Sequence, residues 1–191
     1  MDLVSRAKNI CLSPAAEWRV IEGEPATPAS LLTGYALPLA SIGAIAAFVG
    51  TVLFGGMFGV YRPSILFALV NAVFSVAIAL VMCVVLGLII DALAPTFGST
   101  KDPLKAFKVA AYYPTAAWLA GALLLIPGIG IIVMLVGAIY SLYLLYVGLP
   151  ILMKTPADKQ VGYFVAVLVV AIVVLGIINV ITNRIIYSGM F

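Results

Sequence analysis

Five long apolar stretches, separated by short polar segments, make up most of the 191-residue chain. Each has at least 20 residues, and none carries a charged side chain near its middle. The stretches are Leu31–Phe54, Ser64–Ile90, Ala106–Ile126, Gly128–Leu152 and Val161–Thr182. About 20 helical residues cross the hydrocarbon core of a bilayer, and these stretches are too continuous for the strands of a barrel. The pattern therefore predicts an all-α, polytopic membrane protein with five transmembrane helices.

Composition agrees with this fold class and removes several functional classes. Hydrophobic residues make up 65% of the chain and charged residues 9%, which leaves too little polar surface to cover a soluble globule. The chain has no histidine, the commonest general base and transition-metal ligand. The sequence also lacks a Ser–His arrangement, an HExxH motif and a phosphate-binding glycine loop. We therefore expect no enzymatic activity, no metal and no cofactor.

The lysines and arginines predict the orientation of the chain. Five spans place the two ends on opposite sides of the membrane, and short cytoplasmic loops are enriched in Lys and Arg. Arg62 and Arg184 lie on the side of the C-terminus, so that end is expected to be external. The other eight cations lie on the side of the N-terminus, which is expected to be cytoplasmic: Arg6, Lys8, Arg19, Lys101, Lys105, Lys108, Lys154 and Lys159. All seven carboxylates share that side, so the modest net charge gives no reason to expect a nucleic-acid partner.

Residues 1–30 form an N-terminal segment ahead of the five-helix domain of residues 31–191. Ser13 can cap a helix and Pro14 suits the first helical position, so the segment is expected to hold two short helices. The first has apolar residues at helical spacing, with Arg6 and Lys8 on its other side, as in a helix that lies on a membrane surface. Trp18 in the second favours the headgroup level. Interfacial anchoring is the simpler interpretation, and partner binding is the functional one.

Polar side chains inside the second and fifth stretches give the first set of candidate site residues. Asn71 and Asn179 should lie at similar depth near the external side, with Asn183 beyond them, and we predict that Asn71 and Asn179 contact each other. Ser75 continues from Asn71 along a ridge of small residues, Asn71, Ser75, Ala79, Cys83 and Gly87, that lets another helix approach closely. These residues are expected to hold helices together through close packing and interhelical hydrogen bonds, and a hydrophilic external funnel is the alternative.

A second set of candidates lies in the cytoplasmic half. Pro38 and Pro114 should bend the first and third helices and free backbone carbonyls, to which hydroxyl groups can donate. The candidate donors are Tyr112, Tyr113 and Thr115. A cavity, if the protein has one, is expected in this layer, and an aromatic belt is the simpler interpretation. Asp91 either faces a vestibule, pairs with one of three lysines, or is an ordinary interfacial charge; the lysines are Lys101, Lys105 and Lys108.

Several short motifs occur between residues 90 and 165. They are Ala94-Pro95-Thr96-Phe97-Gly98, Ala110-Ala111-Tyr112-Tyr113-Pro114, Trp118-Leu119-Ala120-Gly121, Ile126-Pro127-Gly128-Ile129-Gly130 and the segment from Tyr140 to Lys159. In these motifs the chain resembles the bacterial branch of the Yip1 family. The resemblance implies a five-helix protein of the bacterial inner membrane with a cytoplasmic N-terminus. Its landmark residues, which form no catalytic set, include Tyr112, Pro114, Gly148, Pro150 and Lys154. Eukaryotic relatives are associated with Rab GTPases, a role that a bacterial chain does not take over.

These observations favour a non-enzymatic membrane organiser, a compact bundle that binds lipids, another membrane protein or a second copy of itself. The alternative is a channel or facilitator for a small solute or ion, with Asn71, Asn179 and the Tyr/Pro layer along its path. An intramembrane enzyme is the least favoured class, since no general base is evident. The expected partners are the lipid bilayer and a membrane protein or homo-oligomer, with no nucleic acid.

Overall fold

The computed structural model describes residues 2–55, 63–126 and 129–188, with the side chains of residues 179, 181–183 and 185–188 left aside. All regular secondary structure in this part of the chain is helical. The elements are α1 (Leu3–Leu12), α2 (Pro14–Gly23), α3 (Pro28–Leu31), the π-helix η1 (Leu32–Ala36), α4 (Leu37–Phe54), α5 (Ile65–Leu93), the 3₁₀-helix η2 (Ala94–Phe97), α6 (Pro103–Tyr112), α7 (Thr115–Ala120), the 3₁₀-helix η3 (Gly121–Leu125), α8 (Ile129–Met153) and α9 (Gln160–Ser188).

Within the described residues, four helical segments are long and apolar enough to cross a membrane: Pro28–Phe54, Ile65–Phe97, Ile129–Met153 and Gln160–Ile178. They correspond to the first, second, fourth and fifth predicted stretches. The third predicted stretch is not one continuous helix, because the chain divides it into α6, α7 and η3. The broken segment still packs along α8, as expected for neighbours joined by a short turn. The turn itself, at residues 127–128, lies outside the described part.

Pro114 and Gly121 account for the division of the third stretch. Proline has no N–H, and its ring clashes with the carbonyl four residues earlier. Accordingly α6 ends at Tyr112 and α7 begins at Thr115. Beyond α7 the backbone tightens into η3, where a Cβ atom on Gly121 would lie 2.9 Å from the Cα atom of Gly43 in α4. The predicted bend at Pro114 is confirmed, whereas the prediction of an uninterrupted helix was wrong.

The bend expected at Pro38 takes the form of a widened turn. The π-helix η1 directly precedes α4, and Pro38 stands in the first turn of α4. In a regular α-helix the proline ring would press against the carbonyl of Gly34, and a π turn relieves that contact. The first span therefore runs from α3 through η1 into α4 without a break.

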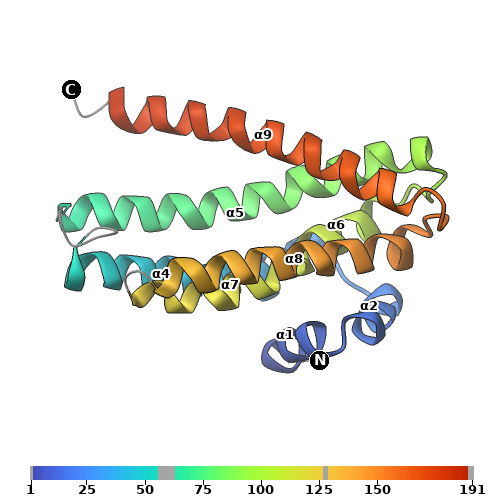
Figure 1. Cartoon of the computed structure of the whole chain (residues 1–191), viewed down its shortest axis with the longest axis horizontal. Coiled ribbons are helices and arrows are strands. Elements are labelled where there is room, and N and C mark those ends of the chain that lie inside the picture. The colour runs from blue at the N-terminus through green and yellow to red at the C-terminus, as the bar shows by residue number, and fades with distance from the viewer. Residues whose placement is uncertain (1, 56–62, 127–128, 189–191) are drawn as a thin grey trace.

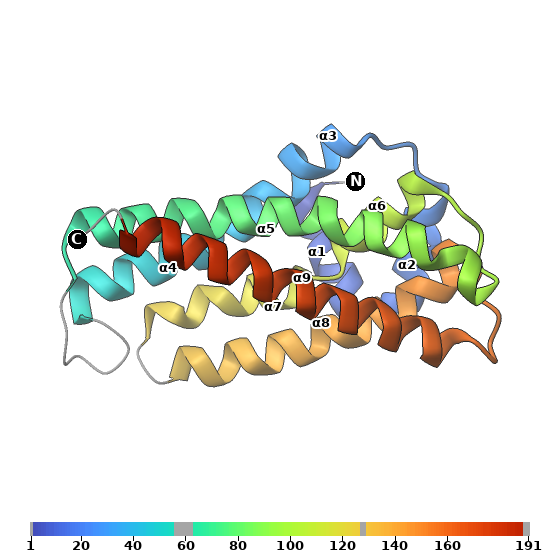
Figure 2. The same ribbon diagram turned by 90° about the horizontal axis from the view of Figure 1, so that it is seen from above.

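The long helices run side by side in an elongated bundle, and the N- and C-terminal regions lie toward opposite ends of it (Figures 1 and 2). We call the end with η2 and residues 154–159 the proximal end, and the end with Gly55 and Ile126 the distal end. α1 and α2 lie on one side of the proximal half, while α9 crosses the bundle and ends distally (Figure 2).

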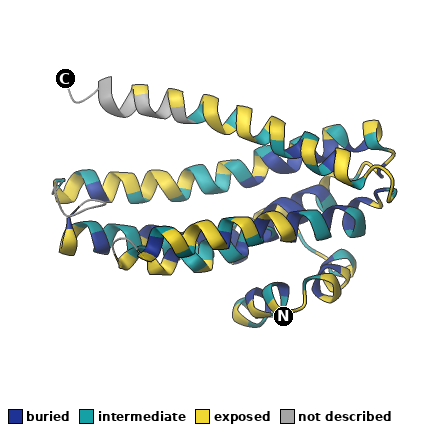
Figure 3. Ribbon diagram, viewed as in Figure 1, coloured by how far each residue is buried: buried dark blue, intermediate teal, exposed yellow. Residues whose placement is uncertain are grey.

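The tightly packed core occupies the proximal half of the bundle (Figure 3). Its fully buried side chains include Trp18, Leu39, Ile90, Val109, Leu145, Leu149 and Tyr163. In the distal half, long helices expose apolar residues such as Leu53, Leu66 and Ile132. A soluble protein would bury such side chains, whereas a membrane protein turns them toward lipid.

Among the described side chains of α9, those that are fully buried lie near its beginning, and those further along are largely exposed. Tyr163 is fully buried, and its hydroxyl group donates to the carbonyl of Ile90 at 2.5 Å. Its ring stacks on Phe97 with centroids 5.2 Å apart. Further along, Ile172 is 66% exposed and no atom lies within 4 Å of the Cβ position of Gly176. The distal part of α9 therefore splays away from α5 (Figure 1).

Candidate functional site

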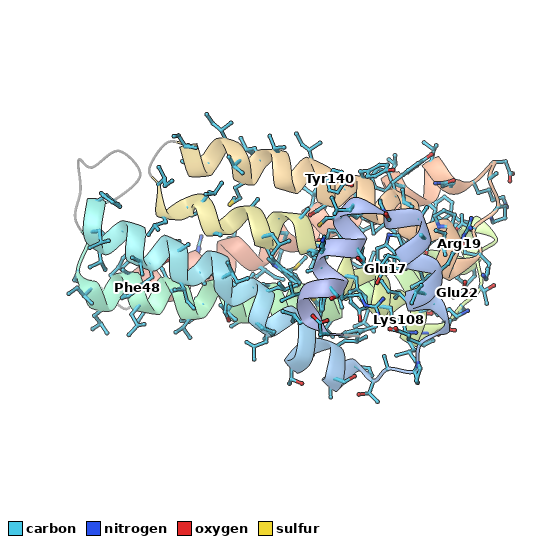
Figure 4. The ribbon with its side chains drawn as sticks, turned by 90° about the horizontal axis from the view of Figure 1, so that it is seen from below. Glu17, Arg19, Glu22, Phe48, Lys108 and Tyr140 are labelled. Atoms are coloured by element: carbon cyan, nitrogen blue, oxygen red, sulfur yellow. The ribbon has the colours of Figure 1, made fainter. Side chains whose placement is uncertain are left out.

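α1 and α2 lie crosswise to the long helices and cover one side of the proximal half (Figure 4). The side chain of Asp2 accepts a hydrogen bond from the Ser5 amide at 3.0 Å and so caps α1. The predicted boundary is confirmed, since α2 begins at Pro14. The Ser13 side chain makes no capping hydrogen bond, so that detail of the prediction was wrong. α1 packs on α7, and α2 packs on α8.

Arg6 is the most deeply buried cation of this segment. Its guanidinium group donates to Glu17 Oε1 at 2.5 Å and also pairs with Glu24. The same group lies 5.8 Å from the ring centroid of Tyr112. Burial alone would lower the pKa of Arg6, but the hydrogen bond and the charge of Glu24, aided by the charge of Glu17, raise it. The prediction that Arg6 lies on the outer face of the first helix was wrong, because two carboxylates from α2 and the residue after it compensate the buried charge.

Lys108 of α6 holds the end of α2. Its Nζ atom donates to the carbonyls of Ile21 at 2.7 Å and Glu24 at 2.6 Å, with a longer bond to that of Glu22. Carbonyl groups at the end of a helix have no partner within the helix, and a cation there also favours the helix dipole. Figure 4 shows Lys108 beneath α2. Lys108 therefore serves the N-terminal segment and does not pair with Asp91.

The residues of the Tyr/Pro layer, Tyr35, Tyr112 and Thr115 beside Pro114, lie where the N-terminal segment packs on the bundle. The Thr115 hydroxyl donates to the Tyr112 carbonyl at 2.6 Å and lies 2.7 Å from the Tyr35 hydroxyl. This is the role that the sequence predicted for a hydroxyl group beside Pro114. The rings of Tyr35 and Tyr112 lie 4.4 Å apart. Tyr113 is not part of this cluster.

Two contacts fix the N-terminal helices on α8. The Trp18 indole lies so close to the backbone of Gly148 that a Cβ atom there would be 2.7 Å from its Cε2 atom. The Tyr140 hydroxyl donates to the Cys11 carbonyl at 2.6 Å. We refer to the residues that join the N-terminal segment to the bundle as the N-terminal clamp: Arg6, Glu17, Trp18, Glu24, Lys108, Tyr112 and Tyr140. Sequence reasoning had not grouped them.

A partly exposed group of ion pairs lies next to the clamp, with Glu22 at its centre. Glu22 pairs with Lys154 at 2.5 Å and with Lys105 at 3.3 Å. The hydrogen bond from Lys154 is the main cause that lowers the pKa of Glu22, with that from Lys105 assisting against the opposite effect of burial. Because Lys105 binds Glu22, it is not the partner of Asp91 either.

Asp91 lies apart from the clamp at the proximal end of α5. It is only 9% exposed, and its Oδ1 atom has no hydrogen-bond partner among the described residues. Of the three lysines considered for it, Lys108 is bound to carbonyls at the end of α2, and Lys105 is paired with Glu22. Lys101 forms no ion pair in the part of the chain that the structure describes.

The polar side chains of Asn71 and Ser75 in α5 form hydrogen bonds within their own helix. Asn71 is exposed and donates to the Phe67 carbonyl of its own helix at 2.9 Å. Ser75, also exposed, donates to the Ala72 carbonyl at 2.8 Å. The side chains of Asn179 and Asn183 lie outside the described residues, and so does the predicted contact between Asn71 and Asn179. The proximal end of the small-residue ridge acts as predicted, since Gly87 admits the backbone of Phe107.

Three hollows lie along α4 and α5 in the more distal part of the bundle. Two of about 440 and 450 Å³ share the lining residues Ala44, Phe48 and Ala72. The third, about 330 Å³, is also lined by α7, η3 and α8. Their walls are mainly apolar, and small side chains predominate in the third. None of these three hollows is lined by clamp residues, so the cavity expected in the Tyr/Pro layer is not found among them.

The clamp holds the N-terminal segment on the bundle. Its charged groups face one another or backbone carbonyls, and it is closed by aromatic rings. Trp18 Nε1 is the exception among the clamp's buried side-chain atoms, because it lacks a hydrogen-bond partner in the described structure. Within the described ranges, no three Cys, Asp or Glu side chains gather where they could hold a metal ion.

Comparisons with known proteins identify a family model and two curated relatives that resemble the chain. A family model described as the Yip1 domain matches residues 8–178, a range that includes most of the clamp and the long helices. Two curated relatives, both described as inner membrane protein YohC, come from Escherichia coli K12 and Escherichia coli O6:H1. Each is 26% identical to the chain over 174 residues, which cover 88% of the chain and 89% of the relative. No solved structure matches the chain.

Proposed function

Because the chain belongs to the Yip1 domain family, we propose that it is a non-enzymatic organiser of the bacterial inner membrane that binds a transmembrane helix of another subunit. The groove between α4 and α5 is the proposed binding surface. One observation carries this proposal: the proximal half of the bundle is packed and clamped, whereas the distal half leaves mainly apolar hollows along α4 and α5 whose shared wall includes the small residues Ala44 and Ala72. Small residues let helix backbones approach closely in a bilayer, where van der Waals packing drives association.

The finer topology belongs to the same proposal. The N-terminus is cytoplasmic and the C-terminus external, with the broken segment α6–α7–η3 as a fifth crossing beside α8. The distribution of Lys and Arg supports this orientation, and so does the location of the two terminal regions toward opposite ends of the bundle (Figure 1). Reporter fusions after Thr100 and after the last residue test it. A cytoplasmic reporter at both positions contradicts the proposal.

Site-specific photocrosslinking in living cells tests the proposed binding surface. Val73 is 61% exposed and lines the groove, so a photoreactive residue there should capture a protein. A product of twice the 20.0 kDa chain mass identifies a second copy, and another mass identifies a different subunit. Ala72→Leu, which fills the groove, should abolish the product, while Ala122→Leu on the exposed surface of η3 should leave it unchanged. Absence of any protein product at Val73 contradicts the proposal.

A facilitator for a small solute is the second candidate, favoured by one specific observation. The hollow of about 450 Å³ includes Thr51, Asn71 and Ser75 in its wall. Both Asn71 and Ser75 are bound to carbonyls of their own helix, which argues for local satisfaction of polar groups over a hydrated route. Solute flux into proteoliposomes that Asn71→Leu reduces would favour this candidate over the organiser.

A further inference from the structure

The outer surface of α1 and α2 combines exposed apolar side chains with cations. On α1, Val4 is 71% and Leu12 70% exposed, and the exposed Lys8 lies between them at spacings of four residues. On α2, the exposed Arg19 stands next to Val20. Such a surface is typical of a helix that lies in the boundary between lipid headgroups and acyl chains.

Apart from the exposed Asp2, which caps the start of α1, the carboxylates of this segment face cations of the protein, whereas two of its three cations face outward. The three glutamates turn to cations of the protein: Glu17 and Glu24 to Arg6, and Glu22 to Lys105 and Lys154. Lys8 and Arg19 take part in none of the ion pairs of the described structure, and both are exposed. Figure 4 shows Arg19 on α2, away from Glu17. Although the segment has four acidic and three basic residues, Lys8 and Arg19 make the outward face of α1 and α2 basic.

The position of α1 decides what this outward face meets. The Cys11 carbonyl, near the end of α1, is bound to the hydroxyl of Tyr140, which stands near the middle of the spanning helix α8. α1 therefore lies beside a helix that crosses the bilayer, and it lies crosswise to that helix (Figure 4). In this position the apolar side chains meet acyl chains. Trp18 of α2 contacts α8 at Gly148, eight residues closer to the proximal end than Tyr140, so the segment extends from there toward the headgroups, to which lysine and arginine can extend their charged ends.

From these three observations we propose that α1 and α2 form a binding platform for anionic phospholipids of the leaflet at the proximal end, with Lys8 and Arg19 contacting the lipid phosphate and Val4 and Leu12 its acyl chains. Charge complementarity selects anionic over zwitterionic headgroups, and apolar contact selects a lipid over a free anion. The platform is independent of the groove between α4 and α5, so either proposal can fail without the other.

Native mass spectrometry of the full chain in neutral detergent tests the platform, with phosphatidylglycerol and phosphatidylcholine as competing probes. The wild type should bind phosphatidylglycerol in preference. The double variant Lys8→Gln/Arg19→Gln should bind it about 25-fold more weakly, since each cation near a membrane surface contributes about fivefold. The matched control Lys101→Gln/Lys159→Gln removes the same charge from exposed positions at the same end but off the platform, and it should keep the preference.

Three outcomes would overturn the proposal. These are equal binding of both lipids by the wild type, equal loss of preference in both double variants, or full competition by inorganic phosphate. A variant Val4→Ser/Leu12→Ser separates the apolar contribution, and it should weaken both lipids without changing their ratio. The exchanged side chains all lie outside the packed core, so each variant should fold. Circular dichroism and size-exclusion chromatography check this.

Discussion

The indole ring of Trp18 lies against the backbone of Gly148, with 2.7 Å between the Cβ position at residue 148 and the nearest indole carbon. α2 can dock on α8 only because residue 148 has no side chain. This contact joins an N-terminal helix to a membrane-spanning one, and Trp18 is completely buried by it.

Gly148→Ala is therefore expected to displace α2 from α8, at a cost of about 1–3 kcal/mol for overpacking. The measurement is the emission maximum of Trp18 in a Trp118→Phe background, where Trp18 is the only tryptophan. The maximum should shift to the red as the indole becomes hydrated. Gly176→Ala is the matched control, since no atom lies within 4 Å of the added methyl group. An unchanged spectrum for Gly148→Ala contradicts the tight contact.

Arg6→Met is expected to destabilise the clamp by about 3–5 kcal/mol, because it leaves the buried carboxylate of Glu17 without its counter-charge. Limited proteolysis between α2 and α3 measures the release of the N-terminal helices and should become faster. The triple variant with Glu17→Gln and Glu24→Gln should recover much of the protection, since it removes the orphaned charges. If Arg6→Met alone is as resistant as the wild type, Arg6 does not hold the clamp.

Thr115→Val keeps the shape of the side chain and removes its hydroxyl group. It should cost about 1–3 kcal/mol, because the buried Tyr35 hydroxyl loses its partner. Thermal unfolding in detergent provides the measurement. Adding Tyr35→Phe should restore part of the loss, since both polar partners are then gone. Additive losses in the double variant would show that the two hydroxyl groups do not interact.

Lowering the pH should weaken the attachment of α2 to the bundle, because it protonates Glu22 and removes its ion pairs with Lys105 and Lys154. Its pKa is lower in the folded protein than its ordinary value of 4.5, mainly because of Lys154. The folded state thus gains stability from the ionised carboxylate above that value and loses it as the pH falls through the lowered pKa. Hydrogen exchange of α2 should accelerate on this acidic side in the wild type. Glu22→Gln should reduce the difference between neutral and acidic pH, and a wild-type difference that survives unchanged would assign it to other carboxylates.

The long helices could be predicted from the sequence because hydrophobicity alone specifies them. Continuous apolar stretches locate α4, α5, α8 and α9, and Pro114 signals a bend in the remaining stretch. The 3₁₀ turns of η3 could not be predicted in the same way. They depend on the close approach of Gly43 to Gly121, two residues far apart in the chain, and no local pattern encodes that approach.

The clamp was harder to predict than the helices, for a physical reason. A charged residue such as Arg6 is normally assigned to the exposed face, and only the carboxylates of Glu17 and Glu24 make its burial tolerable. Helical periodicity does not show which helices meet. Lys108 raises the same difficulty, because its partners are backbone carbonyls that have no signature in the sequence.

The splayed distal part of α9 sets how strictly its sequence is constrained. Around Tyr163 and Val167, each side chain must match the volume left by its neighbours. The exposed side chains of Ile172, Val173 and Ile177 would instead face fluid acyl chains in a bilayer, which rearrange around any apolar shape. Exchanges among Val, Ile and Leu should therefore be accepted freely toward the C-terminal part of this helix and penalised near its beginning, so that tolerance to mutation rises along a single helix.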